Sequence, residues 1–277
     1  GIPMNMCILG ASSFIGSYVK NYFEKLGYLV VGTYQTPQPF YEEDSSMFPF
    51  QMHEGACMKL LQILEPDIIF YSLRGDFSLQ LITLQEVIDY IKSHSHKKLV
   101  FLSTANVFDG DLSHIHIETD TCCSKSDYGK FKIQCEKLIS TQIESQSVIL
   151  RIPQVYDKNC PRITRLQNLI HEQKPIETVK NLEVNLTTRE QISSWTLYIL
   201  SHQLNGIFHV GTDDTCEYMN FDQTIIKALS LGNATYSISC EFPQTHYQAV
   251  IPNRSEIPGH LHMKISGLLV YLSSHKK

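Results

Sequence analysis

The chain has 277 residues, a formal net charge of -5 at pH 7 and an apolar fraction of 43%. This length suits one large α/β domain, or such a domain with a smaller lobe. The mildly acidic balance excludes nucleic acid and an anionic membrane surface as expected partners, and no apolar run approaches the roughly 18 residues of a membrane span. We expect a cytoplasmic protein, and we interpret residues 1–3, ahead of Met4, as an expression remnant.

From Met4 onward, apolar strand-like runs alternate with amphipathic helical stretches. The expected strands are NMCILG (5–10), YLVVGTY (28–34), a short one near 47–52, DIIFYSL (67–73), KLVFLST (98–104) and SVILRIP (147–153), and the expected helices between them are 13–27, 57–66, 79–95 and 128–142. This alternation predicts an α/β fold of the Rossmann type, a doubly wound parallel sheet with helices on both faces.

Beyond Tyr156 the rhythm changes. Helices are expected over 162–175 and 188–203, GIFHVG (206–211) is interpreted as a late strand of the main sheet, and the last 65 or so residues hold scattered short elements. The predicted organisation is therefore a Rossmann domain over 4–157, to which 192–213 return, and a smaller C-terminal α/β substrate lobe made of 158–191 and 214–277.

In an open parallel sheet, ligands bind beyond the carboxyl ends of the strands. Four segments lie there in the prediction: GASSFIG (10–16), YSLRG (71–75), STANVFDG (103–110) and IPQVYD (152–157). In the first of them, Gly10 permits a tight turn and Gly16 permits close packing of helix on strand, while the helix N-terminus offers N–H groups to a pyrophosphate. Ser13 stands where a third glycine is usual in such turns, and we interpret it as a small residue that contacts the pyrophosphate.

Tyr128 and Lys132 are four residues apart in an expected helix, so they share one face. A nearby ammonium favours the ionised form of a tyrosine, which makes the phenol a better acid–base group near neutral pH. Ser103 and Thr104 end the preceding strand, where a hydroxyl can hold a substrate carbonyl. Each of these signals is common by itself, and their arrangement at one predicted sheet edge points to catalysis.

Together, GASSFIG, LVFLSTANVFDG, SDYGKFKIQCEKLI, VILRIPQVYD and GIFHVG resemble the extended short-chain dehydrogenases/reductases, and most of all their dTDP-4-dehydrorhamnose reductase branch. The resemblance implies a nicotinamide cofactor, NAD or NADP, and a nucleotide-linked sugar as substrate. It implies catalytic roles for Thr104, Tyr128 and Lys132, with Tyr128 protonating the C4 carbonyl oxygen. A homodimer is the one assembly that we considered.

The same resemblance assigns the remaining site residues by position. The implied cofactor contacts are Gly10, Ser12, Ser13, Phe14, Ile15, Gly16, Thr33, Tyr34, Gln35, Ser72, Leu73, Ser103, Tyr128, Lys132 and Ile152, and the implied substrate contacts are Arg74, Ala105, Asn106, Val107 and Pro153.

Several positions depart from the family pattern. At the end of the second strand, 33–35 offer neither an acidic residue for the 2′-hydroxyl of NAD nor an arginine for the 2′-phosphate of NADP. Two alternatives therefore stay open beside the reductase: a sugar-nucleotide 4-epimerase, and a non-catalytic binding protein like the regulatory beta subunit of methionine adenosyltransferase. A 4,6-dehydratase is not favoured, because Ala105-Asn106 follow Thr104 where elimination needs an acid pair.

The cysteines and histidines predict neither a redox nor a metal site. The eight cysteines show no CxxC spacing and are read as reduced thiols, including the adjacent pair Cys122-Cys123. Three HxH pairs (His94/His96, His114/His116 and His260/His262) have no cysteine or acidic partner at a familiar metal-site spacing in the sequence. No metal site is expected.

Overall fold

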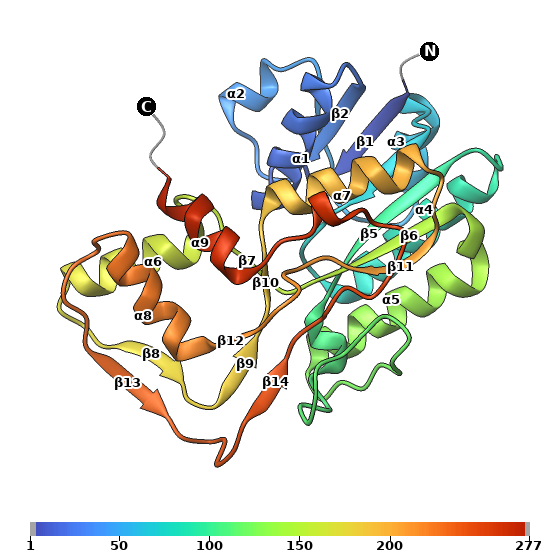
Figure 1. Cartoon of the computed structure of the whole chain (residues 1–277). Coiled ribbons are helices and arrows are strands. Elements are labelled where there is room, and N and C mark those ends of the chain that lie inside the picture. The colour runs from blue at the N-terminus through green and yellow to red at the C-terminus, as the bar shows by residue number, and fades with distance from the viewer. Residues whose placement is uncertain (1–3, 275–277) are drawn as a thin grey trace. The chain divides into compact units, whose positions relative to one another are not determined.

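A computed structural model of the chain describes residues 4–274. The interpretation of residues 1–3 as a remnant falls outside this described part. Contacts divide the chain into two compact units (Figure 1). Among the described residues, the first comprises 4–103, 130–150 and 192–208, and the second comprises 104–129, 151–191 and 209–274. The contact division thus groups 104–129 and 151–157 with the second unit.

The predicted doubly wound sheet is confirmed. It has seven strands in the order β11-β6-β5-β4-β1-β2-β3, and the pairs β1·β2, β1·β4, β2·β3 and β4·β5 are parallel. Its strands are β1 (Asn5–Leu9), β2 (Leu29–Tyr34), β3 (Met47–Pro49), β4 (Ile68–Tyr71), β5 (Lys98–Thr104), β6 (Ser147–Ile152) and β11 (Gly206–His209). The late strand at 206–211 does join this sheet, as the sequence predicted.

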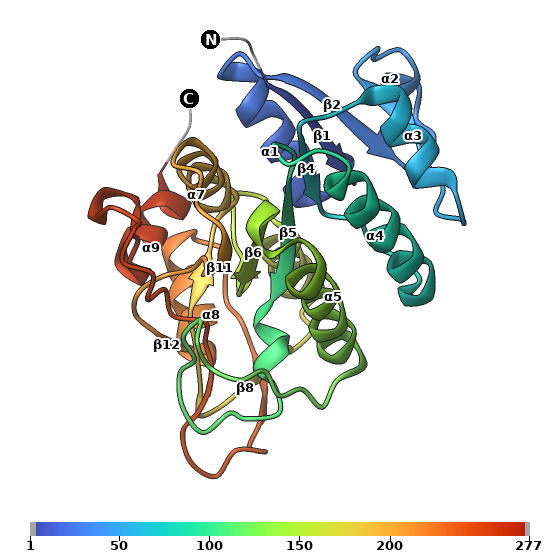
Figure 2. The ribbon, with the colours of Figure 1, turned by 90° about the vertical axis from the view of Figure 1, so that its right-hand side faces the viewer.

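Helices cover both faces of the sheet. These are α1 (Phe14–Lys25), α3 (Ala56–Leu64), α4 (Phe77–Lys92), α5 (Asp127–Ile143) and α7 (Arg189–Ser201). Figure 2 shows α3, α4 and α5 on one face, with α1 and α7 on the other. Alternate strand residues such as Cys7, Leu9 and Ile69 pack under the first group of helices and are fully buried, as a sheet covered on both sides requires.

Local sequence explains where these helices begin and end. Ser13 is the N-cap of α1, and Gly27 follows its end with a φ of 92°. Asp76 caps α4 by accepting a hydrogen bond from the backbone N–H of Leu79 at 2.9 Å. Such caps satisfy backbone groups that a helix end leaves unpaired. In the segment 36–52, predicted as loop and short strand, the structure adds a four-residue helix, α2 (Pro39–Glu42), which begins at a proline.

The second unit is built from short strands and three helices. Its strands form three small sheets, β10-β7, β12-β9-β14 and β13-β8. The strands are β7 (Gln154–Val155), β8 (Ile176–Val179), β9 (Leu182–Val184), β10 (Leu186–Thr187), β12 (Cys216–Glu217), β13 (Tyr236–Ser239) and β14 (His246–Gln248), and the helices are α6 (Pro161–His171), α8 (Tyr218–Ala228) and α9 (Ile265–Ser273). The described residues also form three 3-10 turns. Two of them, η1 (Ala105–Phe108) and η3 (Gly259–Leu261), lie in the second unit, and η2 (Glu144–Gln146) lies in the first. The described part of the chain contains no helix long and apolar enough to cross a membrane.

Candidate active site

The turn after β1 has the geometry of a phosphate-binding turn. Gly10 has a φ of 86°, and the N–H of Ser13 closes the turn on the carbonyl of Gly10 at 3.1 Å. The hydroxyl of Ser13 accepts a hydrogen bond from the N–H of Gly16 at 3.0 Å. Ser13 therefore starts α1 and directs the positive end of the helix dipole out of the sheet edge.

Two positions of this turn, Gly10 and Gly16, leave no room for a side chain. A Cβ on Gly10 would lie 2.5 Å from the carbonyl oxygen of Ser72, and one on Gly16 would lie 2.2 Å from the carbonyl oxygen of Gly10. Both distances are far inside van der Waals contact, so only glycine fits at either position. The shape of this turn fits a dinucleotide pyrophosphate, which needs backbone N–H groups within reach.

The predicted ribose-reading residues at the end of β2 have different roles from one another. Thr33 is 1% exposed, and its hydroxyl accepts a hydrogen bond from the N–H of Gly10 at 2.9 Å. Tyr34 is buried and stacks on Tyr41 with ring centroids 5.1 Å apart. Gln35 is partly exposed and donates from Nε2 to the carbonyl of Arg74 at 3.3 Å. Thr33 therefore supports the turn from beneath, and Gln35 is the member of this group that lies near the surface.

The segment after β4 borders the same turn. The hydroxyl of Ser72 lies 3.2 Å from that of Ser13 and 3.2 Å from the carbonyl of Gly10. Leu73 is buried in the core, and Arg74 is exposed. Gly10, Ser13, Gly16, Thr33 and Ser72 thus form one hydrogen-bonded cluster within the first unit, as the sequence predicted of neighbouring strand ends. Ser12 is exposed, and Phe14 and Ile15 are partly exposed in the first turn of α1.

Lys132 is a cation held inside the first unit. It is 6% exposed, and its Nζ donates to the carbonyl of Leu102 at 2.9 Å and lies 4.6 Å from the ring centroid of Phe101. Burial lowers the pKa of Lys132 from 10.5 to about 8, because removal from water penalises the ammonium form. Leu102 is two residues before Thr104 in β5, so the ammonium is anchored close to the end of that strand.

Ser103, implied as a cofactor contact, uses its hydroxyl within the first unit. Its hydroxyl donates to Oε2 of Glu136, which is also buried, at 2.5 Å. This bond joins β5 to α5 one turn after Lys132. Glu136 was not singled out in the sequence, although a glutamate four residues after a candidate catalytic lysine is a signal that the helical period would have supplied.

Thr104 and Tyr128 belong to the second unit. Thr104 is 8% exposed, and its hydroxyl donates to Oδ1 of Asn106 at 3.0 Å while accepting from the N–H of Asn106 at 3.2 Å. Tyr128 lies in the first turn of α5 and is 43% exposed. Tyr128 and Lys132 are in the same helix, four residues apart, as expected.

Gly129 explains how α5 begins against this segment. A Cβ there would lie 2.0 Å from the hydroxyl oxygen of Ser124 and 2.3 Å from the carbonyl oxygen of Asn106. Asp109 holds the loop ahead of the helix by accepting from the hydroxyl of Ser124 and the N–H of Lys125, both at 2.7 Å. The four predicted substrate-side positions near here differ in exposure: Ala105 and Val107 are buried, Asn106 is partly exposed, and Pro153 is buried after the partly exposed Ile152.

A buried polar network in the second unit escaped the sequence reading. Arg151 is 2% exposed and donates from Nη1 to the carbonyl of Glu118 and to Nε2 of His209, at 3.4 and 3.2 Å. Burial and the Arg151 charge lower the pKa of His209 to about 3, so this imidazole is neutral. The sequence did contain one sign of this network, because Arg151 is a charged residue within the otherwise apolar strand SVILRIP.

Comparisons with known proteins identify the family and the fold of this chain. The model of the RmlD substrate binding domain family matches residues 84–263, which is more than half of the chain. The chain belongs to this family. The resemblance to the dTDP-4-dehydrorhamnose reductase branch of the extended short-chain dehydrogenases/reductases is thereby confirmed.

Three relatives of this RmlD-family chain have informative names. The spore coat polysaccharide biosynthesis protein SpsK of Bacillus subtilis is 26% identical over 143 residues, 51% of this chain and 50% of that protein. The match thus spans about half the length of this curated relative. Among solved structures, dTDP-4-dehydrorhamnose reductase from Bacillus anthracis in complex with NADP has a TM-score of 0.78 at 16% identity, covering 98% of this chain and 97% of that one. UDP-glucuronic acid 4-epimerase from Bacillus cereus in complex with NAD has a TM-score of 0.77 at 20% identity, covering 98% and 96%.

Proposed function

We propose that this protein is an NAD(P)-dependent reductase of a nucleotide-linked 4-keto-deoxysugar. The observation that carries the proposal is Lys132, held beneath the end of β5 by the carbonyl of Leu102, one helical turn from Tyr128. A buried lysine at this place has no packing advantage over an apolar residue, because burial penalises its charge. Its presence one helical turn from Tyr128, in a chain of the RmlD family, supports a chemical role.

Tyr128, Thr104 and Lys132 have different roles in the proposed reaction. A reduced nicotinamide, when bound at the turn after β1, would supply the hydride for the C4 carbon of the sugar. Tyr128 gives its phenolic proton to the C4 oxygen, which becomes a hydroxyl, and Thr104 orients that oxygen through its own hydroxyl. Lys132 as an ammonium favours the phenolate that Tyr128 leaves behind.

The cofactor is proposed to bind the turn formed by Gly10, Ser13 and Gly16. The pyrophosphate takes hydrogen bonds from the N-terminus of α1, where Ser13 Oγ already holds the N–H of Gly16. Gln35 is the partly exposed residue proposed to face the adenosine ribose, and the exposed Arg74 stays a proposed substrate contact. NAD and NADP are both carried forward, because 33–35 include neither an acidic residue nor an arginine. The cytoplasmic location and the homodimer remain predictions.

The deciding experiment is turnover of a dTDP-linked 4-keto-6-deoxysugar with NADH and with NADPH, followed by loss of nicotinamide absorbance and by sugar analysis. We expect turnover in the wild type and a loss of at least about 100-fold in Tyr128→Phe, the lower end of what removal of a general acid costs. Tyr198→Phe, in a helix of the first unit, is the matched control and should keep full activity.

A second candidate is the 4-epimerase, which the similarity to the Bacillus cereus enzyme supports at fold level. An epimerase would interconvert a 4-hydroxy sugar nucleotide without net consumption of NADH, again with dependence on Tyr128. A binding protein of the same fold would bind nicotinamide without turnover, and Tyr128→Phe would change nothing. Absence of nicotinamide binding at millimolar cofactor would exclude the reductase.

A further inference from the structure

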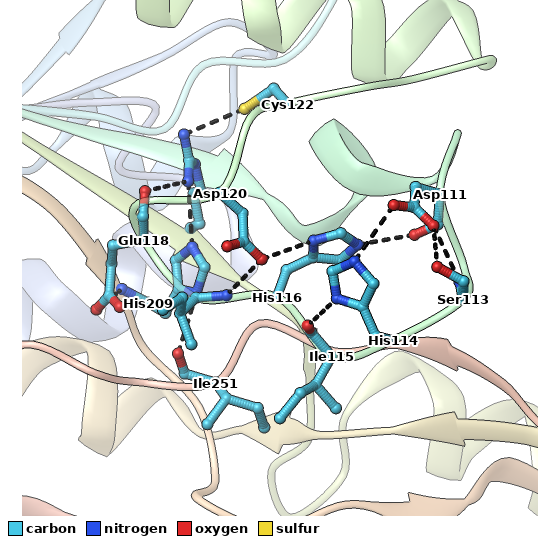
Figure 3. Close-up of polar contacts among 12 residues, drawn as sticks. Asp111, Ser113, His114, Ile115, His116, Glu118, Asp120, Cys122, His209 and Ile251 are labelled. Carbon is cyan, nitrogen blue, oxygen red and sulfur yellow. Dashed lines mark hydrogen bonds and ion pairs between the residues drawn. The ribbon is translucent and has the colours of Figure 1, made fainter.

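Three metal-ligand side chains converge in the loop between η1 and α5. They are Asp111, His114 and His116, each of which offers one ligand atom, and those atoms all lie within 4.8 Å of one another (Figure 3). Within the described residues 4–274, this is the one group of three or more histidine, cysteine or acidic side chains that meets so closely. All three belong to the second unit.

His114 presents Nε2 to the cluster. Its Nδ1 lies 2.6 Å from the carbonyl oxygen of Ile115, and a carbonyl only accepts, so Nδ1 carries the proton. In the neutral ring, Nε2 then has the free lone pair, and it lies 3.4 Å from Oδ2 of Asp111. A backbone carbonyl on one nitrogen and a bare lone pair on the other is the usual arrangement of a histidine that binds a metal.

His116 differs, because both of its ring nitrogens face an oxygen atom. Its Nδ1 lies 3.0 Å from Oδ2 of Asp120, while Nε2 lies 2.7 Å from the carbonyl oxygen of Asp111. Both ring nitrogens therefore face oxygen atoms that accept, which a neutral imidazole cannot satisfy. A metal ion bound at Nε2 would replace the contact with the Asp111 carbonyl, while Asp120 holds Nδ1–H as in carboxylate–histidine–metal sites.

The spacing is close to that of a coordinated ion. Ligand atoms about 2.1 Å from a tetrahedral zinc ion lie about 3.4 Å from each other, which is the separation of Asp111 Oδ2 and His114 Nε2. All three ligand atoms of the group lie within 4.8 Å of one another, and the His114 ring is exposed. Packing fixes the other imidazole, because His116 is 3% exposed and stacks on Phe108 with centroids 4.2 Å apart.

The two other HxH pairs show that the pattern alone does not create such a cluster. His96 lies 3.4 Å from Asp67 and His262 lies 2.8 Å from Asp213, each as a single histidine–aspartate pair. Asp111, His114 and His116 form the one group, among the residues described, in which three such ligand atoms converge.

We propose that Asp111, His114 and His116 bind a divalent transition-metal ion of the zinc class, oriented by Asp120. Imidazole and carboxylate ligands suit zinc, cobalt and nickel. The ion tightens the loop where it joins β14, since His116 exchanges backbone hydrogen bonds with Ala249 and Ile251, at 3.1 and 2.8 Å. The site is structural and separate from the proposed reductase chemistry.

The test is calorimetric titration of metal-free, untagged protein with zinc chloride, together with thermal unfolding and the Co²⁺ absorption spectrum. We expect one ion per chain and an upward shift of Tm with zinc, because an ion that binds only the native state stabilises it. His114→Ala should raise the Kd at least about tenfold, and Asp120→Asn should raise it by about 10-fold or more, the usual cost of losing a second-shell partner.

The double variant His94→Ala/His96→Ala is the matched control, and its Kd should equal that of the wild type. His114 is exposed, so its replacement by alanine leaves the fold intact, and far-UV circular dichroism checks this. Equal Kd values in wild type and His114→Ala, no binding at millimolar zinc, or a thiolate-to-cobalt band that assigns the ion to cysteine would each overturn the proposal.

Discussion

Burial of the Lys132 ammonium costs stability at the place where the proposed chemistry needs a cation. Its pKa falls from 10.5 to about 8 because burial penalises the ammonium. Below pH 8 both the folded and the unfolded chain carry the proton, so the cost of burial is fully present. Between about pH 8 and 10.5 only the unfolded chain keeps it, and stability rises with pH across that window.

This predicts a pH-dependent effect of Lys132→Met. At pH 7 the variant escapes the burial cost, and that advantage over the wild type should shrink by about 3 kcal/mol by pH 10.5, since each pKa unit corresponds to about 1.4 kcal/mol. Urea unfolding at a series of pH values measures it. Lys130→Met, which removes the same charge from an exposed position of α5, isolates the effect of burial. A constant difference between the two variants would contradict the assignment.

The glycines on either side of α1, Gly10 and Gly27, should respond differently to replacement by alanine. Gly10 and Gly27 have almost the same backbone, with φ of 86° and 92°, but a Cβ would meet the Ser72 carbonyl at Gly10 and nothing within 4 Å at Gly27. Gly27→Ala should cost about 1 kcal/mol of unfolding free energy, the price of a left-handed alanine. Gly10→Ala should cost roughly 1–3 kcal/mol more, because the turn must shift.

Nicotinamide binding separates the two glycine variants further. Fluorescence titration with NADH and NADPH should show weaker binding in Gly10→Ala and the wild-type Kd in Gly27→Ala. Equal binding by both variants would remove the turn from the cofactor site.

The loop that leads into α5 depends on one carboxylate. Although burial opposes it, hydrogen bonds from Ser126, the N–H of Lys125 and Ser124 hold the pKa of Asp109 below its ordinary value. The stabilisation that ionised Asp109 gives the folded chain is therefore fully present above the pKa of the unfolded state. It is lost as the pH falls through the lower pKa of the folded state. In Asp109→Ala, amide exchange at Lys125 should become at least about tenfold faster, since its acceptor is gone.

Hydrogen-exchange mass spectrometry at neutral pH measures this protection, and titration to acid should remove it from the wild type. Asp44→Ala is the control, because Asp44 likewise accepts from a serine hydroxyl and N–H two residues on, in the first unit. Unchanged exchange at Lys125 in Asp109→Ala would show that the loop is held by other contacts.

Across the whole molecule, the sequence predicted the main sheet strand by strand, and it predicted the second unit only as a smaller lobe with a helix near α6. Buried strands such as β4 and helices with capping residues carry their signals locally. Thr33 and Ser103 show what sequence reasoning cannot supply. Both were assigned to a ligand, and the hydroxyl of each forms a hydrogen bond with a residue 23 or 33 positions away in the chain. The same limit applied to Asp111, whose approach to His114 depends on the path of a loop, since such contacts leave no periodic trace in the sequence.

The connectivity of the two units predicts cooperative unfolding. Each unit consists of three separate chain segments, so the chain passes between them five times, at 103/104, 129/130, 150/151, 191/192 and 208/209. Neither unit is a continuous piece that could be completed before the other begins. Loss of either unit would leave the strand ends of β5, β6 and β11 without part of their chain, because each of these strands spans a crossing.

Probes in the two units should therefore report one transition in urea. Trp195, fully buried in the first unit, gives fluorescence, while the buried thiols of Cys57 in the first unit and Cys160 in the second become reactive on unfolding and can be pulse-labelled and mapped by mass spectrometry. We expect the three midpoints to coincide, and to rise together when a saturating nicotinamide is added, because a ligand that binds only the native state stabilises the whole cooperative unit. Earlier labelling of Cys160 than of Cys57, or a rise confined to Trp195 and Cys57, would show that the two units unfold separately.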